Sequence, residues 1–319
     1  MEYYIHMSIN LILIIICLLV LIILWSSSLL FYRDKNTFDI ETNEENVFSP
    51  KCKSIILKHE RKTDTAVLMI HGFPSTPSVY DYSANCFFEE GFDSYAFLLP
   101  GFGTSCEDFK KTYFTQWFNF LCRKYEMLKS NYDNVAIVGI SMGGALTLKL
   151  GEKYSETDLE PLTIIPISAP VIFNSLIKDR KITKFSFYFA RIISIFKKYF
   201  NVGIVNRDKD GEDGSDRWLG YSGVFLPQAI SLVHAEKKIR KDLKKITCPM
   251  FAVHNVSDET VPFFNLPIIA KENNSKYFRS KIIKMDGFKH TKHVLLLYFS
   301  VQEELTNDII NFIKGRLNE

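Results

Sequence analysis

The segment AIVGISMGGALTL, residues 136–148, restricts the fold of this chain more than any other feature. A run of apolar and β-branched residues ends at Gly139, Ser141 lies between glycines, and a small-residue helical pattern follows. This order predicts a buried strand that turns sharply into a helix. Neighbours without side chains fit such a corner, because the serine there adopts strained backbone angles. Ser141 is therefore either a nucleophile on a strained elbow or the serine of an ordinary tight turn.

The rest of the chain alternates strand and helix patterns. Several predicted strands are continuous apolar runs, as expected for parallel strands that are covered on both faces. Helical patterns lie between them, for example over residues 114–130, and a last helix is predicted over residues 293–317. The alternation predicts an α/β fold with a mostly parallel central sheet and helices on both faces. The predicted strands are residues 54–57, 65–72, 94–100, 134–140, 162–168, 250–255 and 281–285.

One interval interrupts this alternation and divides the predicted core. Residues 171–245 contain no clear strand, and an insertion there would lie above the carboxyl edge of the sheet, where open α/β folds bind ligands. We therefore expect a helical cap, or lid, between core segments 51–170 and 246–319, with residues 33–50 as a linker before the core. Residues 178–200 mix basic and large apolar residues at helical spacing. They are interpreted as a cap helix over the site, or as a cap helix that also docks on a membrane through Phe189 and Phe196.

The N-terminal segment, residues 1–32, is predicted to be a transmembrane anchor. Every residue from Leu11 to Trp25 is apolar, and with the flanking residues the stretch is long enough to cross a bilayer as one helix. A cleaved signal peptide is the alternative, but no basic residue precedes the apolar run. Arg33 and Lys35 follow the span, which favours a single-pass membrane protein with a cytoplasmic catalytic domain.

Composition argues against several other classes of protein. The net charge of +3 shows no general attraction to nucleic acid. The six cysteines are scattered without metal-binding spacing, so we expect reduced thiols and no disulfide framework. The acidic stretch DKDGEDGSD, residues 208–216, has Asp213 and Leu219 where a calcium loop has its sixth-position glycine and twelfth-position carboxylate. It is interpreted as an exposed loop, and no metal or cofactor is expected.

A serine nucleophile needs a base and an acid, in the chain order serine, acid, histidine. His290 and His293 both lie in DGFKHTKHVLLL after the last predicted strand. We prefer His293, which stands directly before the final predicted helix, and His290 is the alternative. Asp258, in the turn VHNVSDETVP, is the predicted acid that orients the imidazole. His254 is interpreted as structural.

The oxyanion donors are predicted from two further positions. The backbone amide of Met142 lies at the start of the helix that follows Ser141. The stretch LMIHGFPSTP, residues 68–77, predicts a strand followed by an irregular loop, in which the amide of Phe73 is the second donor. His71 precedes the serine in the chain, so it is not the expected base. Together these features predict acyl transfer through a serine.

The chain resembles α/β-hydrolases of the bacterial carboxylesterase and monoacylglycerol lipase group, which are serine aminopeptidase S33-like hydrolases. The matching pieces are HGFPSTP, LLPGFGTSCEDF, VGISMGG, SDETVP and TKHVLLL, in family order over about residues 64–319. By resemblance, Ser141, Asp258 and His293 match the triad, and Phe73 and Met142 match the oxyanion donors. Phe102 departs from the pattern, because the family commonly has histidine there.

The resemblance implies a cofactor-free hydrolase of carboxylic esters, of the monoacylglycerol, lysophospholipid or a similar lipid type. Two alternatives share this fold, because fold does not fix the substrate. One is a serine peptidase or amidase. The other is a ligand-binding signalling protein that keeps the triad and turns over slowly.

Overall fold

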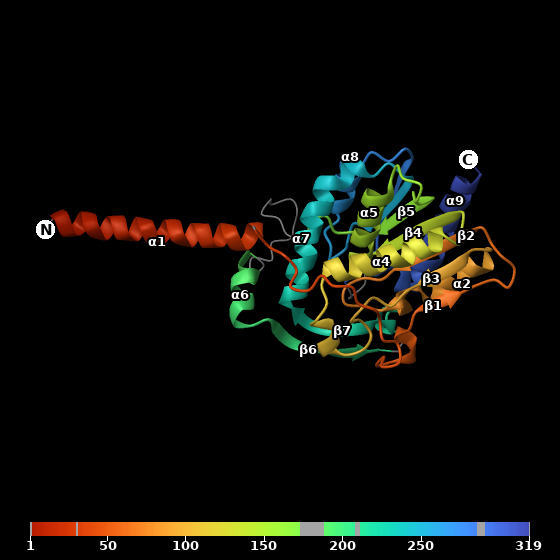
Figure 1. Ribbon diagram of the computed structural model, residues 1–319, viewed down its shortest axis with the longest axis horizontal. Helices are drawn as coiled ribbons and strands as arrows, with labels where there is room; N and C mark the ends of the chain where they lie inside the picture. The colour runs from red at the N-terminus through yellow and green to blue at the C-terminus, as the bar shows by residue number, and fades with distance from the viewer. Residues whose placement is uncertain (1, 30, 173–187, 208–210, 286–290, 319) are drawn as a thin grey trace.

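Seven strands form the sheet at the centre of the molecule, and one long helix projects away from it (Figure 1). The computed structural model describes residues 2–29, 31–172, 188–207, 211–285 and 291–318. The order of strands across the sheet is β1-β3-β2-β4-β5-β8-β9. Only β1 runs antiparallel to its neighbour, so the predicted mostly parallel sheet is confirmed. The strands are β1 (Ile55–Leu57), β2 (Thr65–Ile70), β3 (Asp93–Ala96), β4 (Asn134–Ile140), β5 (Thr163–Ile167), β8 (Met250–Asn255) and β9 (Phe278–Ile283).

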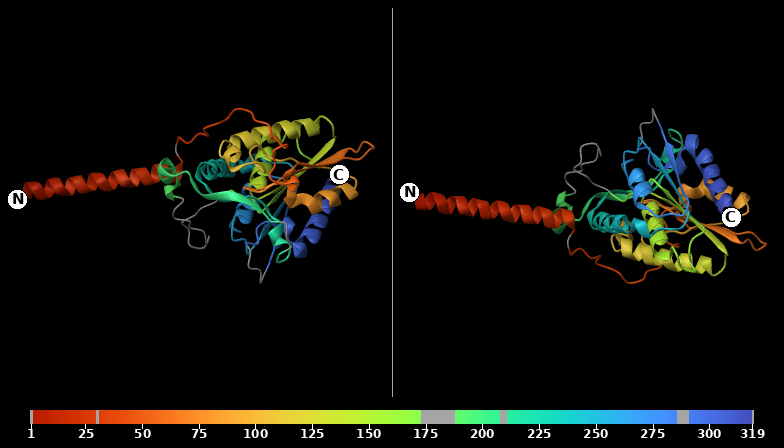
Figure 2. Two further views of the ribbon diagram at one scale, coloured as in Figure 1. Left: turned by 90° about the horizontal axis from the view of Figure 1, so that it is seen from below. Right: turned by 90° about the horizontal axis from the view of Figure 1, so that it is seen from above.

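Helices cover both faces of the sheet, because the central strands are apolar on both sides. In β2, Leu68 packs with the apolar side chains of one face and Met69 with those of the other, as alternation along a strand requires. The first face is covered by α4 (Phe114–Lys129), α5 (Met142–Tyr154) and α8 (Asn265–Glu272). The opposite face is covered by α2 (Asp81–Glu89) and α9 (Phe299–Leu317), and Figure 2 shows the sheet between these two layers.

The last predicted helix was placed too early in the chain. It was expected over residues 293–317, but α9 begins at Phe299 and a short 3₁₀ turn, Leu295–Leu297, precedes it. Leu295, Leu296 and Leu297 are all buried in the core beneath the sheet. His293 therefore stands on a loop before this turn and not at the start of the helix.

The expectation of an all-helical cap was also wrong. Residues 171–245 contain α6 (Ala190–Phe196) and α7 (Leu226–Asp242), but also β6 (Tyr199–Asn206) and β7 (Leu219–Phe225), which pair as an antiparallel two-stranded sheet. Tyr199 and Phe200, expected in a helix, belong to β6. Both strands are rich in aromatic and β-branched residues, and this composition, which is typical of β-strands, could have predicted them. The connection between them is long, so no short turn motif marked a hairpin.

The predicted linker lies against the core. Residues 33–50 form no long helix or strand, but Asp34 accepts hydrogen bonds from the Thr115 amide and hydroxyl and from Ser231 on α7. Thr42 donates to the Leu98 carbonyl at 2.6 Å. These contacts tie the segment to both the core and the cap.

Helix α1 (Glu2–Ser28) contains the apolar stretch Ile9–Ser27, which is long and apolar enough to cross a membrane. A signal sequence near an N-terminus has the same length and composition, so these properties fit both readings. The end of α1 is attached to the cap: Trp25 lies 3.8 Å from the guanidinium of Arg191, and Leu29 is buried in a small cluster with Ile230 and Val233.

Some predicted features lie outside the described residues. These are residues 173–187, with part of the expected cap helix, and residues 208–210 of the acidic stretch. The same holds for residues 286–290, which include the alternative base His290.

Candidate active site

Strand order brings the predicted reacting residues to one edge of the sheet. Ser141 follows β4, Asp258 follows β8 and His293 follows β9. These strands belong to the parallel run β4-β5-β8-β9, so their carboxyl ends point to the same edge. The loop that begins at His71 follows β2, which pairs with β4 in register from Thr65 to Ile70. This edge is where parallel α/β sheets bind ligands.

Ser141 occupies the strained turn that the sequence predicts. Its backbone angles are φ +59° and ψ −124°, a conformation that residues with side chains rarely adopt. The turn closes only because its neighbours are small: a Cβ on Gly143 would lie 1.8 Å from the Ile70 carbonyl oxygen. A Cβ on Gly139 would lie 2.2 Å from the Gly143 carbonyl oxygen. The Ser141 amide also donates to the Ile167 carbonyl at the end of β5.

Asp258 and His293 form a buried pair, although 35 positions separate them in the chain. His293 Nδ1 lies 2.7 Å from Asp258 Oδ2, and both side chains are almost fully buried. Asp258 Oδ1 accepts hydrogen bonds from the amides of Thr260 and Val261, each at 2.8 Å. Burial acts to raise the pKa of the Asp258 carboxyl, but the charge and hydrogen bond of His293 outweigh it and hold that pKa below its ordinary value. An ionised Asp258 fixes the His293 tautomer that carries its proton on Nδ1.

Three neighbours hold this pair in place, and of these only His254 is singled out by the sequence, as a structural residue. His254 Nε2 lies 3.6 Å from Asp258 Oδ2 and 3.0 Å from the Val261 carbonyl oxygen, and burial lowers the pKa of its imidazole. Asn255 Nδ2 donates to the Lys292 carbonyl, which ties the aspartate loop to the histidine loop. Lys292 also pairs with Glu259 at 2.7 Å, across the same two loops. No sequence pattern marks the contacts of Asn255 and Lys292, because they join two loops that meet only in the folded chain.

The second nitrogen of His293 remains available for a reaction partner. Nε2 is buried and has no hydrogen-bond partner among the residues that the structure describes, Ser141 included. A serine–histidine hydrogen bond often forms or tightens only when substrate binds. Beside His293 lies a cleft of about 420 Å³, whose walls include Phe73, Trp218 and Leu297. Arg207, Glu259 and Thr291 also line it, so a substrate in this cleft would contact both apolar and polar side chains next to the imidazole.

The predicted oxyanion loop lies directly against the serine turn. A Cβ on Gly72 would lie 2.9 Å from the Ser141 Cβ, so only glycine permits this approach. Met142 is the first residue of α5, so its amide has no acceptor within the helix. The cap also supports this loop, because the Tyr221 amide of β7 donates to the Pro74 carbonyl at 3.0 Å.

His71 is a structural residue of this loop. Its Nε2 accepts a hydrogen bond from the Leu99 amide, which leaves the proton on Nδ1, 3.1 Å from the Gly72 carbonyl oxygen. Burial lowers the pKa of its imidazole to about 4, so the ring is neutral at physiological pH. His71 joins the loops after β2 and β3, in agreement with its exclusion as the base.

Phe102, the departure from the family pattern, is a core residue. Its ring is fully buried and packs edge-on against His71, Phe109 and Trp117, with ring centroids 4.8–5.2 Å apart. A histidine there would bring a polar ring into this aromatic cluster. The effect of Phe102 is therefore to hold the loop after β3 by apolar packing.

The described part of the chain contains no cluster of side chains that could bind a metal ion. No group of three or more His, Cys, Asp or Glu side chains lies close enough there to hold a metal ion. The six cysteines are all free thiols, and burial raises the pKa of Cys52 to about 11 and that of Cys248 to about 12. Cys52 and Cys248 therefore stay protonated and act as small apolar core residues.

Comparison with known proteins identifies the family to which the chain is similar. The profile of the family described as serine aminopeptidase, S33, matches residues 61–293. A thermostable monoacylglycerol lipase from Bacillus sp. (strain H-257) is 25% identical over 207 residues, which cover 64% of this chain and 74% of that protein. A carboxylesterase from Bacillus subtilis (strain 168) is 32% identical over 114 residues, or 35% of this chain and 44% of that protein.

Among solved structures, a soluble variant of monoglyceride lipase from Saccharomyces cerevisiae, in complex with a substrate analogue, is similar with a TM-score of 0.64. The alignment covers 90% of this chain and 97% of the yeast protein, at 17% identity. At this identity the likeness supports the fold alone.

Proposed function

Because this chain belongs to the serine aminopeptidase S33 family of α/β-hydrolases, we propose that it hydrolyses the carboxylic ester of a monoacylglycerol, a lysophospholipid or a similar lipid. Ser141 is the nucleophile, His293 the general base and Asp258 the acid that orients the imidazole. The observation that carries this assignment is the buried Asp258–His293 pair, at the same sheet edge as the strained Ser141 turn.

The reaction runs through an acyl-enzyme. His293 Nε2 accepts the Ser141 hydroxyl proton as Oγ attacks the ester carbonyl carbon. The tetrahedral intermediate collapses, the C–O bond to the alcohol breaks, and the imidazolium returns its proton to the leaving oxygen. A water molecule then gives a proton to His293 and attacks the acyl carbon. The bond from this carbon to Ser141 Oγ breaks, the imidazolium returns the proton to Oγ, and the carboxylic acid leaves. Asp258 stabilises the imidazolium at both stages.

The amides of Phe73 and Met142 stabilise the negative charge that develops on the carbonyl oxygen. Two observations support this role: the contact between Gly72 and the Ser141 side chain, and the position of Met142 at the start of α5. Each such donor contributes about 3 kcal/mol to transition-state stabilisation in comparable enzymes.

A lipid-like substrate is supported by the named relatives and by the cleft. The curated relatives are a monoacylglycerol lipase and a carboxylesterase. The cleft beside His293 has a mixed lining, and its apolar part, which includes Phe73, Trp218 and Leu297, suits an acyl chain.

The apolar helix α1 anchors the enzyme in the membrane that supplies its substrate. Its Ile9–Ser27 stretch is almost entirely exposed in the structure, as a segment that contacts lipid would be. The catalytic body lies on the cytoplasmic side, because Arg33 and Lys35 directly follow the span.

The nucleophile is tested by labelling and by turnover. We expect a fluorophosphonate probe to label the wild-type enzyme and not Ser141→Ala, and Ser141→Ala to lose at least about 10³-fold in kcat on a monoacylglycerol. Ser168→Ala is the matched control. This buried hydroxyl follows β5 at the same edge and has no hydrogen-bond partner among the described residues, so its removal should leave labelling intact.

A substrate panel separates this function from its alternatives. Monoacylglycerols, lysophospholipids, short-chain esters and an aminoacyl anilide are compared by kcat/KM. If the anilide were cleaved faster than every ester, the protein would be assigned as an amidase and not as an esterase. Labelling of Ser141→Ala at the wild-type level would exclude Ser141 as the nucleophile.

A further inference from the structure

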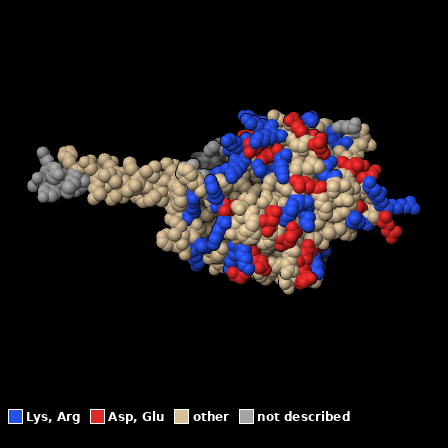
Figure 3. All heavy atoms as spheres, viewed as in Figure 1, with Lys and Arg blue, Asp and Glu red and all other residues tan. Residues whose placement is uncertain are grey.

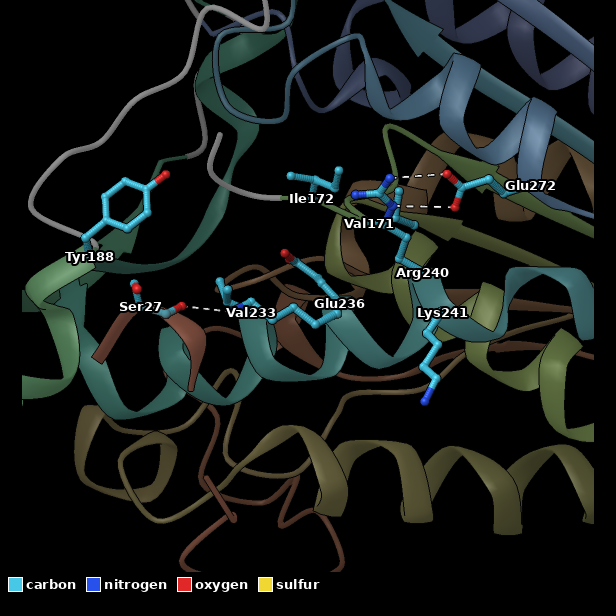
Figure 4. A pocket seen from close by; sticks show the side chains of 10 residues that line it. Ser27, Val171, Ile172, Tyr188, Val233, Glu236, Arg240, Lys241 and Glu272 are labelled. Carbon is cyan, nitrogen blue, oxygen red and sulfur yellow. Dashed lines mark hydrogen bonds and ion pairs between the residues drawn. The ribbon is translucent and has the colours of Figure 1, made fainter. Parts of the chain in front are cut away.

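A second cavity lies between the cap, the core and the end of α1, apart from the cleft beside His293. Its volume is about 550 Å³, and its walls include Val171 after β5, Val233 on α7 and Ser27 on α1 (Figure 4). None of its lining residues also lines the cleft beside His293. We call it the anchor pocket, because Ser27 is the last residue of the apolar stretch.

Glu236 is an unsatisfied polar group in the wall of the anchor pocket. Its side chain is 1% exposed, and neither carboxyl oxygen has a hydrogen-bond partner among the described residues. Burial raises the pKa of this carboxyl to about 8, so at neutral pH it is mostly protonated. Figure 4 shows the carboxyl directed from α7 toward Ile172. A buried acid of this kind can donate one hydrogen bond and accept others, and leaving it unpaired is unfavourable.

Cationic side chains surround the same pocket. Among the residues that the structure describes, Lys237, Arg240 and Lys241 line it, with Glu272 as the one other carboxylate. Arg240 pairs with Glu272 at 3.2 Å, while Lys237 Nζ donates to the Ser27 carbonyl at 2.8 Å and retains two further N–H donors. The pocket therefore carries excess positive charge, which favours an anionic ligand and disfavours a quaternary ammonium.

The position of the pocket relative to α1 indicates where such a ligand would come from. If Ile9–Ser27 spans the bilayer, Ser27 lies at the level of the lipid head groups. The end of α1 is held against the cap by Trp25 and Arg191, and Lys237 binds the Ser27 carbonyl directly. Figure 3 shows Lys and Arg side chains gathered on the part of the body nearest α1, and such a surface attracts anionic lipids.

We propose that the anchor pocket binds the head group of an anionic phospholipid that carries free hydroxyls, with Lys237 on the phosphate and Glu236 hydrogen-bonded to a hydroxyl. Phosphatidylglycerol has this chemistry, whereas phosphatidylcholine offers a cation without hydrogen-bond donors. The inference rests on the proposed membrane anchor and is independent of the proposed ester hydrolysis. A bound lipid of this kind would join α7 of the cap to the bilayer.

The test measures lipid binding to the full-length protein in detergent by native mass spectrometry. The probes are ether-linked phosphatidylglycerol and phosphatidylcholine of equal chain length, which contain no carboxylic ester and so exclude turnover. We expect phosphatidylglycerol to bind at least about tenfold more tightly. Lys237→Gln should lower its affinity about fivefold or more, and Glu236→Leu should remove most of the preference.

Matched variants separate the pocket from general electrostatics. Lys238→Gln makes the same charge change at the next position of α7, on an exposed side chain that does not line the pocket, and should leave the affinity unchanged. Glu236→Gln keeps the shape and hydrogen-bonding capacity of the side chain and should retain the preference for phosphatidylglycerol. It is the variant to measure if Glu236→Leu does not fold. Fluorophosphonate labelling of each variant reports whether the body is folded.

Three results would overturn the proposal. One is equal affinity for the two lipids, and another is equal loss with Lys237→Gln and Lys238→Gln. The third is binding of sn-glycerol 3-phosphate as tightly as the lipid, which would assign the pocket to a soluble phosphate ester. Extraction of the full-length protein from membranes by alkaline carbonate would instead refute the anchor, and loss of turnover alone would concern only the hydrolase assignment.

Discussion

At the scale of single residues, the environment of each group decides its role. Asp258 and Glu236 are both buried carboxyl groups, yet their pKa values shift in opposite directions. Asp258 faces His293 and two backbone amides, which stabilise the carboxylate. Glu236 is fully buried, which raises its pKa, and only the charge of Lys237 acts to lower it. Its neutral form is therefore favoured. One acid is thus suited to orient a base, and the other to bind a ligand as a neutral group.

The raised pKa of Glu236 predicts a pH-dependent stability. In the unfolded chain the carboxyl ionises near its ordinary pKa of 4.5, whereas in the fold it ionises at about 8. The stabilising contribution is complete below pH 4.5 and is lost as the pH rises toward 8. Relative to Glu236→Gln, the wild-type protein should therefore lose on the order of 4 kcal/mol of unfolding free energy between pH 4.5 and 8.

Chemical denaturation in phospholipid-free detergent, at several pH values, measures this difference. Glu303→Gln, which changes an exposed glutamate on α9, is the control and should follow the wild-type curve. If Glu236→Gln and the wild-type protein showed the same pH dependence, Glu236 would not be buried and unpaired in the folded protein.

At the scale of elements, the strand–turn–helix unit β4–α5 depends on close backbone contacts. The Ser141 turn brings α5 so near to β2 that the Gly143 position meets the Ile70 carbonyl. Glycine supplies this space, and the strained angles at Ser141 are maintained by the surrounding strands. The element is therefore both the support of the candidate nucleophile and the point where substitutions are least tolerated.

Gly143→Ala should disrupt this unit. Its Cβ would lie 1.8 Å from the Ile70 carbonyl oxygen, so the helix or the strand must move and displace the Ser141 side chain. We expect at least a 10²-fold loss in kcat/KM and a lower melting temperature. Gly315→Ala, on α9 with no atom near its added Cβ, should be neutral or stabilise the protein by up to about 1 kcal/mol. Wild-type activity of Gly143→Ala would contradict the geometry of the turn.

At the scale of the whole molecule, the anchor, the linker and the cap form a continuous set of contacts. Arg191 on the cap stacks on Trp25 of α1, and Asp34 of the linker joins Thr115 of the core to Ser231 of the cap. The catalytic body therefore contacts the end of α1 directly, in addition to the covalent connection through the linker.

The orientation in the membrane is tested by protease accessibility. In a bacterial host, trypsin added to intact spheroplasts should leave the catalytic body uncut if, as proposed from Arg33 and Lys35, it lies on the cytoplasmic side. Inside-out vesicles should expose it to digestion. Degradation in intact spheroplasts would place the body outside, and the appearance of a shortened chain lacking α1 would favour the cleaved signal peptide.

The sequence alone was sufficient for the parts of this protein that depend on local order. Apolar runs, glycine spacing and the order of Ser141, Asp258 and His293 predicted the sheet and the strands that these residues follow, because strand direction follows from chain order in a parallel sheet. The apolar helix was equally evident, since its composition alone determines where it is stable.

Only the tertiary structure decided the features that join distant segments. The pairing of β6 with β7, the hydrogen bond from Asn255 to the Lys292 carbonyl, the docking of Asp34 on Ser231 and the isolation of Glu236 all depend on it. Asp34 and Ser231 lie 197 positions apart, so no local pattern records their contact. Whether a carboxyl group is paired or alone in a cavity is settled by which side chains the fold brings around it, because desolvation and hydrogen bonding act through space and not along the chain.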